Sequence, residues 1–400
     1  ASSMIPASRK GHTFGPMPHE PRPFRLAVNA RWLLPGALEG TGWYSHRLLE
    51  RLCSTPSWEV HLFFDRHVDG FSYPGSVRHV VGLPARHPWL WKLWNERAVP
   101  WTLRCIKADA YWSPDGLLPS RKALQRVGLG SLPMATTVHD LNFVHQPEGI
   151  PPRVGQYYRN VVGRGAREAD LLLTVSETSK TDLAATYGIP GDRVVVTPNA
   201  PQQDFVPLGA DDALAARDRW AGGRPYFLFV GAFTPRKNVH MLLRAFAEFR
   251  RRNPDRPEAL ILVGNPLHRD PKLEALAQVA GDRVIWAGRA EGQDLNGLYA
   301  GATAFAFPSR FEGFGIPLVE AMASGCPVLS SNASCMPEIA GDAARYAGPD
   351  DLEGWVGLLH GAAVGDPAPW VQRGLDRAAQ YSWDRSADAA RTALTQLIRC

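Results

Sequence analysis

The stretch ATAFAFPSRFEGFGIPLVEAMASGCPVLSS, residues 302–331, contains the unit from which the fold can be predicted. It opens on a continuous apolar run, 302–309, and closes on a second one, 327–331. Neither run alternates apolar with polar residues, which is typical of strands buried on both faces of a parallel sheet. Between the runs, Pro317 suits the first turn of a helix that continues through LVEAMASG. The stretch therefore predicts a strand, a glycine-containing loop, a helix and the next strand.

The same alternation extends over almost the whole chain. The first half has predicted strands at 24–30, 59–64, 108–113, 134–141, 170–176 and 193–199. The second half has them at 226–232, 259–264, 283–288, 302–309, 327–331 and 344–348. The chain has 400 residues, and single cores rarely grow beyond ~250–300 residues. We therefore expect an α/β protein of two doubly wound, Rossmann-like parallel-sheet domains.

The domain limits follow from composition. Residues 1–23 are rich in Pro, Ser and Gly and carry no apolar signal core, so we expect a poorly ordered tail. The first domain is predicted over 24–205 and the second over 206–382. The linker is expected near 200–222, where apolar periodicity is lost and polar residues and Pro increase.

Charge and cysteine content indicate which partners and which cell compartment suit the protein. Residues 1–205 carry 23 Lys and Arg against 17 Asp and Glu, whereas residues 206–400 carry 21 against 22. The basic first half would suit phosphate-bearing partners or an anionic membrane surface, although an ordinary solvated surface explains it equally well. Five scattered cysteines without zinc spacing suit a reducing compartment. No apolar run is long enough to span a bilayer, so we expect a cytoplasmic protein.

Ligands of parallel α/β sheets bind beyond the carboxyl ends of the strands. Residues directly after strands are therefore the first candidates for a site in a cleft between the domains. Gly36, Gly40 and Gly42 follow the first predicted strand and precede a helix pattern. Glycines there let backbone N–H groups approach a ligand at a helix N-terminus, although a plain strand–helix turn would use them as well.

Titratable and charged residues follow two further strands. His139 and Asp140 stand at the end of the fourth predicted strand, where they could face the cleft, although a lone histidine is more often structural. Arg236 and Lys237 stand directly before a predicted helix. A helix N-terminus favours anions, and two cations there would form a focused phosphate site. Adjacent Arg-Lys pairs are also common on surfaces.

The quoted stretch carries two glutamates eight positions apart, Glu312 before the loop and Glu320 inside the helix. Gly313 and Gly315 free the backbone between them, so loop N–H groups can point at a diphosphate. Carboxylates do not bind phosphate, but they accept hydrogen bonds from hydroxyls. A phosphate group with a hydroxyl-rich group at each end describes a nucleoside diphosphate sugar. The structural alternative for Glu320 is a favourable place in the helix dipole.

With these residues in place, the chain resembles the retaining glycosyltransferases of family 4, which have the GT-B fold of two Rossmann-like domains. The resemblance covers nearly the whole chain after residue 24 and rests on EGTGWYSHRLL, DAYWSPDGLLP, TVHDLNF, TVSETSKTDL, TPNA, VGAFTPRKN and FEGFGIPLVEAMASGCPVL. The last contains the Glu-x7-Glu motif and is the most specific. TPRKN and VHDL look most like bacterial mannosyltransferases of O-antigen and exopolysaccharide synthesis. The final helix, 383–400, is expected to pack back on the first domain, as it does in such proteins.

The resemblance also implies residue roles. Glu320 would bind the donor ribose, and Glu312 would contact the transferred sugar. The other implied catalytic residues are His139 near the reacting bond and the diphosphate cations Lys237 and Arg236. The other implied donor contacts are the amides of Phe314, Gly315 and Ile316, the loop glycines Gly40 and Gly42, Asn199 between the domains, and Gly231. Segment 287–295 would border the base.

One departure concerns Gly231. Many relatives have arginine directly after this strand glycine, whereas Ala232 follows it here, so Arg236 is expected to supply the cation.

The implied reaction is a retaining hexosyl transfer without an obligatory metal or cofactor. No Asp-x-Asp sequence follows a predicted strand. The donor suggested first is GDP-mannose, with UDP-N-acetylglucosamine, UDP-glucose and GDP-fucose as alternatives. The acceptor would be a growing glycan or one linked to polyprenyl diphosphate, and no nucleic acid is expected.

Other classes of protein stay open. They are a GT-B epimerase or phosphorylase and a non-catalytic scaffold that binds nucleotide sugars. A nicotinamide dehydrogenase is disfavoured, because no Gly-x-Gly-x-x-Gly follows the first strand.

Segment 87–104 carries four tryptophans among basic residues. Tryptophan with Lys and Arg is typical of membrane interfaces, which would give peripheral contact with the inner membrane face. The alternative is a core helix with buried aromatic rings.

Overall fold

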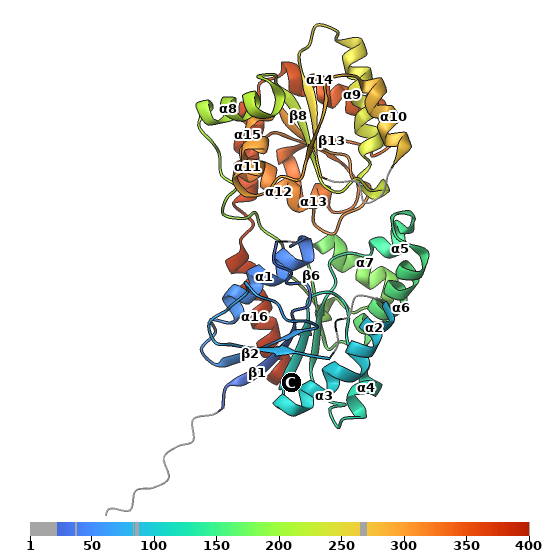
Figure 1. Ribbon diagram of the computed structural model, residues 1–400, viewed down its shortest axis with the longest axis vertical. Coiled ribbons are helices and arrows are strands. Elements are labelled where there is room, and N and C mark those ends of the chain that lie inside the picture. The colour runs from blue at the N-terminus through green and yellow to red at the C-terminus, as the bar shows by residue number, and fades with distance from the viewer. Residues whose placement is uncertain (1–21, 37, 83, 85–87, 265–269, 400) are drawn as a thin grey trace, which may run out of the picture.

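The computed structural model describes residues 22–36, 38–82, 84, 88–264 and 270–399. Within these ranges the chain forms two parallel sheets, each covered by helices on both faces, and the two domains meet at a narrow junction (Figure 1). The predicted class of two Rossmann-like, doubly wound domains is confirmed. The expected tail covers residues 1–23, of which residues 1–21 lie outside the described residues, whereas Arg22 forms an ion pair with Asp109 at 2.6 Å.

The N-terminal sheet has the order β3-β2-β1-β4-β5-β6-β7 in the described part of the chain. Its strands are β1 Phe24–Asn29, β2 Trp58–Phe64, β3 Ser76–Val80, β4 Ala110–Ser113, β5 Met134–Thr137, β6 Leu171–Thr174 and β7 Val194–Val196. Its α-helices are α1 Gly40–Leu52, α2 Pro88–Leu93, α3 Val99–Ile106, α4 Arg121–Gln125, α5 Asn142–His145, α6 Pro152–Glu168 and α7 Glu177–Tyr187. A π-helix, η1 Trp94–Ala98, joins α2 to α3, and η2 Pro147–Gly149 and η3 Gly191–Arg193 are 3-10 turns.

The C-terminal sheet has the order β10-β9-β8-β11-β12-β13 among the described residues. Its strands are β8 Tyr226–Val230, β9 Ala259–Val263, β10 Val284–Gly288, β11 Ala304–Phe307, β12 Val328–Ser331 and β13 Ala344–Ala347. Its α-helices are α8 Ala210–Ala221, α9 Val239–Arg252, α10 Pro271–Ala280, α11 Gly292–Gly301, α12 Ile316–Ala323, α13 Met336–Ala340, α14 Leu352–Val364 and α15 Ala368–Ala378. Two 3-10 turns, η4 Pro235–Lys237 and η5 Gly341–Ala343, precede α9 and β13.

Buried side chains on both faces of the strands explain the continuous apolar runs. In β1, Leu26 and Val28 belong to one core, which includes residues of α1, whereas Ala27 belongs to the core on the opposite face. In β8, Phe227 and Phe229 pack with α9 on one face. Each strand must therefore be apolar at consecutive positions, and all twelve predicted ranges contain a strand.

The structure adds a strand that the sequence pattern did not predict. β3 lies at the outer edge of the N-terminal sheet and pairs in parallel with β2. Its residues Val77 and Val80 are 39% and 60% exposed. An edge strand with exposed positions does not show the continuous apolar run that marks the inner strands.

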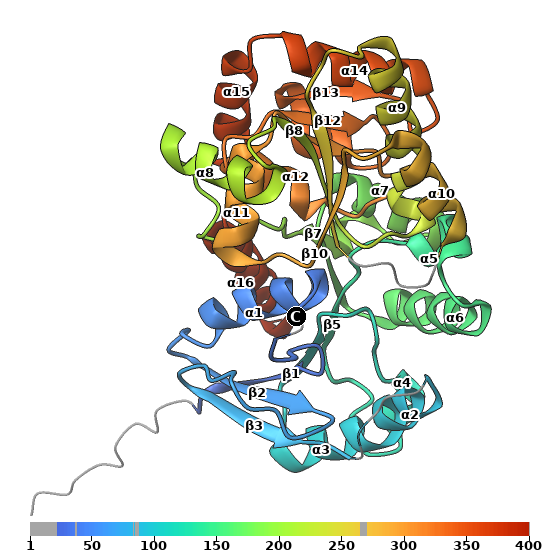
Figure 2. The same cartoon turned by 45° about the horizontal axis from the view of Figure 1, so that its top comes forward.

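The expected linker is shorter than its predicted range. Helix α8 occupies residues 210–221 and packs on α11, so irregular backbone is confined to the segment between β7 and α8. This helix, ADDALAARDRWA, buries only Ala221, which is why its pattern shows little apolar periodicity. The last helix, α16 Trp383–Arg399, lies beside α1 on the N-terminal domain (Figure 2).

The tryptophan-rich segment divides its rings between core and surface. Trp94 is 2% exposed and donates its indole N–H to the carbonyl of Val81 at 2.7 Å. Trp89 and Trp101 are 62% and 63% exposed, and Leu93 beside them is 49% exposed. The core interpretation therefore holds for one side of the segment only. None of the helices that the structure describes has the length and apolar character needed to cross a membrane.

Candidate functional site

The carboxyl edges of the two sheets approach each other where the loop after β11 meets the loop after β5. The Ser176 hydroxyl, in front of α7, donates to the carbonyl oxygen of Gly313 at 2.7 Å. A Cβ placed on Gly313 would lie 2.0 Å from the carbonyl oxygen of His139 and 2.9 Å from Cβ of Asp140. Only glycine allows this approach, so Gly313 brings the Glu-x7-Glu loop into direct contact with the His139 loop.

Glu312 holds both predicted cations. Its Oε2 lies 2.6 Å from Nη1 of Arg236, and its Oε1 lies 2.8 Å from Nζ of Lys237. Glu312 is 7% exposed, and the Lys237 ammonium sits 4.8 Å from the centroid of the Phe307 ring. The predicted phosphate cations and the first glutamate thus form one buried charge cluster at the end of β8 and β11.

The charges of this cluster depend on one another. Burial alone would raise the pKa of Glu312, but Arg236 and Lys237 outweigh it and lower that pKa to about 2. Burial lowers the pKa of Lys237, although Glu312 opposes this effect. Burial also works against the charge of Arg236, but the carboxylates of Glu312 and Asp140 raise its pKa. Glu312 is therefore ionised, and its single negative charge is shared between the two cations.

Glu320 lies apart from these charges, in the second turn of α12. The hydroxyl of Tyr299, on α11, donates to its Oε2 at 3.3 Å. Burial raises the pKa of Glu320 to about 7, and the Tyr299 hydroxyl and Lys237 only partly oppose it. The two glutamates therefore differ in charge state near neutral pH: one is held ionised by cations and the other titrates.

His139 is fixed from the N-terminal domain. Its Nε2 lies 2.9 Å from the carbonyl oxygen of Pro114, and because a carbonyl can only accept, Nε2 carries the proton. The ring meets that of Tyr44 edge to face at 4.8 Å. Burial lowers the pKa of His139, with the Pro114 carbonyl opposing it. The imidazole is therefore neutral at physiological pH, with Nδ1 as a hydrogen-bond acceptor.

Asp140 places a second carboxyl at the junction. Its Oδ1 accepts the N–H of Asn142 at 2.9 Å, which starts the short helix α5. Burial raises the pKa of Asp140, and the Arg236 guanidinium of the other domain is the largest opposing influence. Arg236 thus acts on a carboxylate of each domain.

The glycines after β1 have different surroundings. α1 begins at Gly40, so Gly40 and Gly42 lie in its first turn and not in the loop ahead of it. A Cβ on Gly40 would lie 3.9 Å from Cδ1 of Ile316, which places α1 opposite the start of α12. A Cβ on Gly42 would lie 3.0 Å from the carbonyl oxygen of Trp32, so packing alone explains that glycine. Gly36 has a φ of +69°.

The remaining predicted donor residues follow strands β7, β8 and β11. Gly315 has a φ of +83° and caps α12, whose first residue is Ile316. Phe314 is 3% exposed, and Asn199 is 3% exposed with an Oδ1 that has no hydrogen-bond partner among the described residues. Gly231 has a φ of +147° and lies against the methylene chain of Lys237.

The predicted base-bordering segment, 287–295, includes the end of β10 and the start of α11. The N–H of Gly264, after β9, donates to the carbonyl of Gly288 at 2.7 Å. Residues 265–269, which follow Gly264, lie outside the described residues.

Sequence reasoning missed several partners of these residues. Tyr299 pairs with Glu320, Ser176 pairs with Gly313, and Glu338 contacts the start of α7. The two residues of each pair are 21 to 161 positions apart in the chain, and no local spacing marks such a pair. Of these residues, Ser176 could have been recognised from the sequence, since a serine after a strand and before a helix is a typical N-cap.

A buried ion pair beside His139 was also missed. Arg31 follows β1 and its Nη2 lies 3.0 Å from Oδ2 of Asp115, which follows β4. The Arg31 guanidinium stacks on the rings of Trp91 and Trp94, 5.4 Å from each centroid. The inner side of the tryptophan-rich segment thus reaches the strand ends of the N-terminal domain, next to His139.

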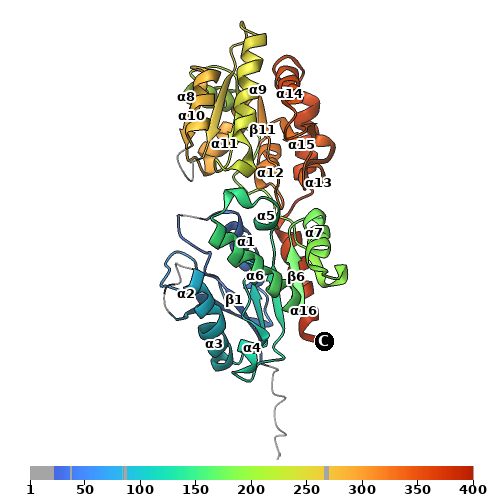
Figure 3. The same ribbon diagram turned by 90° about the vertical axis from the view of Figure 1, so that its right-hand side faces the viewer.

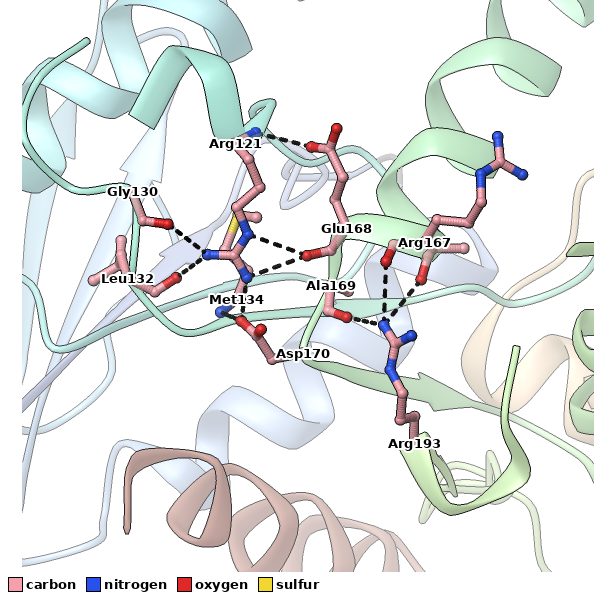
Figure 4. Close-up of polar contacts among 10 residues, drawn as sticks. Arg121, Gly130, Leu132, Met134, Arg167, Glu168, Ala169, Asp170 and Arg193 are labelled. Atoms are coloured by element: carbon pink, nitrogen blue, oxygen red, sulfur yellow. Dashed lines mark hydrogen bonds and ion pairs between the residues drawn. The ribbon is translucent and has the colours of Figure 1, made fainter. Parts of the chain in front are cut away.

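A hollow of about 540 Å³ on the N-terminal domain has a structural explanation. Arg121 donates to the carbonyl oxygens of Leu132 and Glu168 and pairs with Asp170, and Arg193 donates to the carbonyls that end α6 (Figure 4). All three nitrogens of the Arg121 guanidinium and Nη2 of Arg193 are thus used to tie strand starts to helix ends. Within the described residues, no cluster of three or more His, Cys, Asp or Glu side chains is arranged for a metal ion.

Two family profiles match the sequence. The profile described as Glycosyltransferase Family 4 matches residues 38–201, and that described as Glycosyl transferases group 1 matches residues 211–351. The chain is 32% identical over 375 residues to the O-antigen chain mannosyltransferase B of Escherichia coli, covering 87% of this chain and 93% of that protein. It is 29% identical over 220 residues to the O-antigen chain mannosyltransferase RfbU of Salmonella typhimurium, covering 55% of this chain and 58% of that protein.

Among solved structures, the chain is similar to a sucrose-phosphate synthase from Thermosynechococcus elongatus. The TM-score is 0.74 at 21% identity, and the match covers 94% of this chain and 99% of that one. At this identity the likeness concerns the fold alone, and it agrees with the predicted GT-B arrangement of two Rossmann-like domains.

Proposed function

This chain belongs to family 4 of the glycosyltransferases, and we propose that it transfers mannose from GDP-mannose, with retention, to a lipid-linked or growing polysaccharide. The donor and acceptor class rest on the relatives, two of which are O-antigen chain mannosyltransferases by name. The observation that carries the proposal is the buried cluster of Glu312, Arg236 and Lys237, which faces His139 across the domain junction.

The cluster suits the departure of a nucleoside diphosphate. Arg236 and Lys237 lie between the ends of β8 and β11 and directly ahead of α9. Cations and a helix N-terminus can stabilise the negative charge that develops on the leaving phosphate, without a metal or cofactor. Because Glu312 already pairs with both cations, the diphosphate would take over part of that pairing and leave Glu312 free to accept hydrogen bonds from the transferred sugar.

The reaction exchanges one bond at the anomeric carbon for another. The bond to the β-phosphate oxygen breaks, and the acceptor hydroxyl oxygen forms the new bond on the same face, which retains the configuration. Its proton passes to the departing phosphate oxygen. His139, neutral and held by Pro114, would orient the sugar from the opposite domain, and Glu320 would accept hydrogen bonds from the ribose hydroxyls.

A ligand screen tests the donor. The protein is heated with GDP-mannose, GDP-fucose, UDP-N-acetylglucosamine or UDP-glucose, and a ligand that binds the native state raises the melting temperature. We expect GDP-mannose to give the largest rise and radiolabelled mannose to enter a lipid-extractable or polymeric product. A larger rise in melting temperature with a UDP sugar would show that the donor is that UDP sugar and not GDP-mannose. Binding without transfer to acceptor or water would favour the scaffold alternative.

We further propose that the protein contacts the inner membrane face through the outer side of α2, η1 and α3. Trp89, Leu93 and Trp101 are exposed there. Residues 88–107 carry Lys92, Arg97, Arg104 and Lys107 against one acidic residue, Glu96, which is paired inward with Arg164 at 3.0 Å. Exposed tryptophans among cations suit an anionic lipid surface. The opposite side of the same segment reaches Arg31, which would bring a lipid-linked acceptor towards the cleft.

A further inference from the structure

Helix α7 starts at the domain junction, and the other domain supplies part of its cap. Ser176 is the N-cap residue, and its hydroxyl oxygen accepts the N–H of Ser179 at 3.0 Å. The N–H groups of Glu177 and Thr178 donate to the two carboxylate oxygens of Glu338, at 2.8 and 2.7 Å. The Thr178 hydroxyl donates to the same carboxylate at 2.6 Å. Glu338 lies on α13 of the C-terminal domain, which faces α7 across the junction (Figure 3).

A carboxylate is well suited to this place. The first N–H groups of a helix have no partner inside the helix, and the N-terminal end of the helix dipole attracts negative charge. Helices commonly satisfy these groups with a side chain of the N-cap or first turn. Here the carboxylate comes from a residue 161 positions away, in the other domain. These three bonds therefore exist only while the two domains are together.

Glu338 is itself held in position. The carbonyl of its neighbour Ile339 accepts hydrogen bonds from Nε of Arg377 at 2.8 Å and from the Tyr381 hydroxyl at 3.0 Å. Tyr381 also packs edge to face on Phe314, in the Glu-x7-Glu loop, with ring centroids 5.3 Å apart. Arg377 and Tyr381 lie where the chain passes from α15 to α16, on its return to the N-terminal domain. The short helix α13 is thus tied to this crossover and to the donor loop.

The first turn of α7 connects Glu338 to the reacting groups. Ser176 donates to the Gly313 carbonyl, and the Ser179 hydroxyl lies 3.3 Å from the carbonyl oxygens of both Gly313 and His139. Displacing α7 from Glu338 would therefore shift the His139 loop relative to Glu312. Glu312 is 7% exposed, and the side chains of Arg236 and Lys237 are 22% and 12% exposed, so little of the cation pair is open to a donor while the domains are together.

We propose that Glu338 is a positioning residue for glycosyl transfer. By capping α7 across the junction, it holds the domains in the arrangement that sets His139 against the Gly313 loop, and it is released each time the domains open. The kinetic part of this inference rests on the proposed function, whereas the part about domain spacing does not.

The test replaces the carboxylate by its amide. Glu338→Gln keeps the shape but loses the charge and presents N–H groups to the N–H groups of α7. We expect kcat/KM for transfer to fall about tenfold, with the Kd for free nucleoside diphosphate unchanged within about twofold, because the predicted phosphate cations, Arg236 and Lys237, and the predicted ribose contact, Glu320, lie in the C-terminal domain. The matched control is Glu353→Gln, which removes an exposed carboxylate paired with Arg252 inside that domain.

Domain spacing is measured separately, with spin labels on Asp69→Cys and Asp282→Cys in a Cys105→Ser, Cys400→Ser background. Both labelled positions are exposed, one on each domain. Glu338→Gln should shift the distances to longer values, Thr178→Val should shift them less, and Glu353→Gln should leave them unchanged. Distances for Glu338→Gln that coincide with those of Glu353→Gln would overturn the proposal, even if no donor were found. If Glu338→Gln does not fold, the distances of Thr178→Val are compared with those of Glu353→Gln instead, and coinciding distances would again overturn the proposal.

Discussion

At the scale of single residues, the two motif glutamates occupy opposite electrostatic surroundings. Glu312 touches two cations, whereas Glu320 touches a tyrosine hydroxyl. Arg236 and Lys237 lower the pKa of Glu312 to about 2, so this glutamate is ionised at physiological pH. A buried glutamate with only a hydroxyl partner gains or loses its proton near neutrality. We therefore expect one glutamate to contribute mainly to nucleotide binding and the other mainly to turnover.

We expect Glu320→Gln and Glu312→Gln to affect different constants. Glu320 is placed at the ribose, so its amide variant should weaken free nucleotide and sugar donor alike and raise KM. Glu312→Gln frees Arg236 and Lys237 for the diphosphate, so nucleotide affinity should hold or increase, while kcat at saturating donor falls about 10²–10³-fold. Calorimetry with GDP measures the nucleotide affinity of each variant, and kinetics at saturating donor measure its kcat. Equal losses of GDP affinity in the two variants would contradict these roles.

The pKa of Glu320 also predicts a pH dependence. Burial raises that pKa to about 7, so the carboxylate is mostly ionised at pH 8 and mostly protonated at pH 6. If the ionised form accepts the ribose hydrogen bonds, nucleotide affinity should fall about tenfold between pH 8 and pH 6. Since the ligand phosphate titrates as well, the comparison is with Glu320→Gln at each pH. The wild-type and variant curves should converge at low pH, and parallel curves would show that Glu320 does not titrate in this range.

At the scale of elements, the buried strands could be predicted because each is apolar at consecutive positions. β3 and α8 could not be predicted, for a shared reason. Val80 in β3 is 60% exposed, and α8 buries only Ala221, so neither has a full apolar face from which a period could be recognised. The sequence could not decide whether the tryptophan-rich segment is buried or exposed, because it is both: Trp94 lies in the core and Trp101 on the surface.

The outer side of α2 to α3 gives a prediction about lipid binding. Pelleting with vesicles that contain anionic lipid should be strong at low salt and decrease as salt screens the charges. Each cation near such a surface contributes about 1 kcal/mol, so Lys92→Ala and Arg97→Ala should each weaken binding about fivefold. Trp89→Ala with Trp101→Ala should weaken it at all salt concentrations. Trp286→Ala, an exposed tryptophan of the other domain, is the control, and failure to bind at low salt would exclude this contact.

At the scale of the whole molecule, the site belongs to neither domain alone. The sequence predicted which loops follow the strands, and thus His139, Arg236, Lys237 and Glu312. It could not predict how the domains meet, because the bonds between Ser176 and Gly313 and between Glu338 and α7 join loops of different sheets. Gly313 shows the limit well. The glycine was predicted to expose N–H groups to phosphate, whereas the structure adds a second reason for it, the contact with His139.

The close contact between Gly313 and His139 can be tested by adding a single methyl group at Gly313. In Gly313→Ala the new Cβ would lie 2.0 Å from the His139 carbonyl oxygen, and because that atom belongs to the backbone, the loops or the domains must move apart. We expect kcat to fall by more than about tenfold, while GDP affinity stays near that of the wild type, since the phosphate cations and Glu320 lie within the C-terminal domain. The matched control is Gly357→Ala on α14, where a Cβ would meet nothing within 4 Å and where alanine should stabilise the helix by roughly 0.5–1 kcal/mol. Turnover and melting temperature are measured for both variants. Wild-type turnover in Gly313→Ala would show that the two loops need not touch during transfer, and loss of GDP affinity would instead show that Gly313 acts on the nucleotide itself.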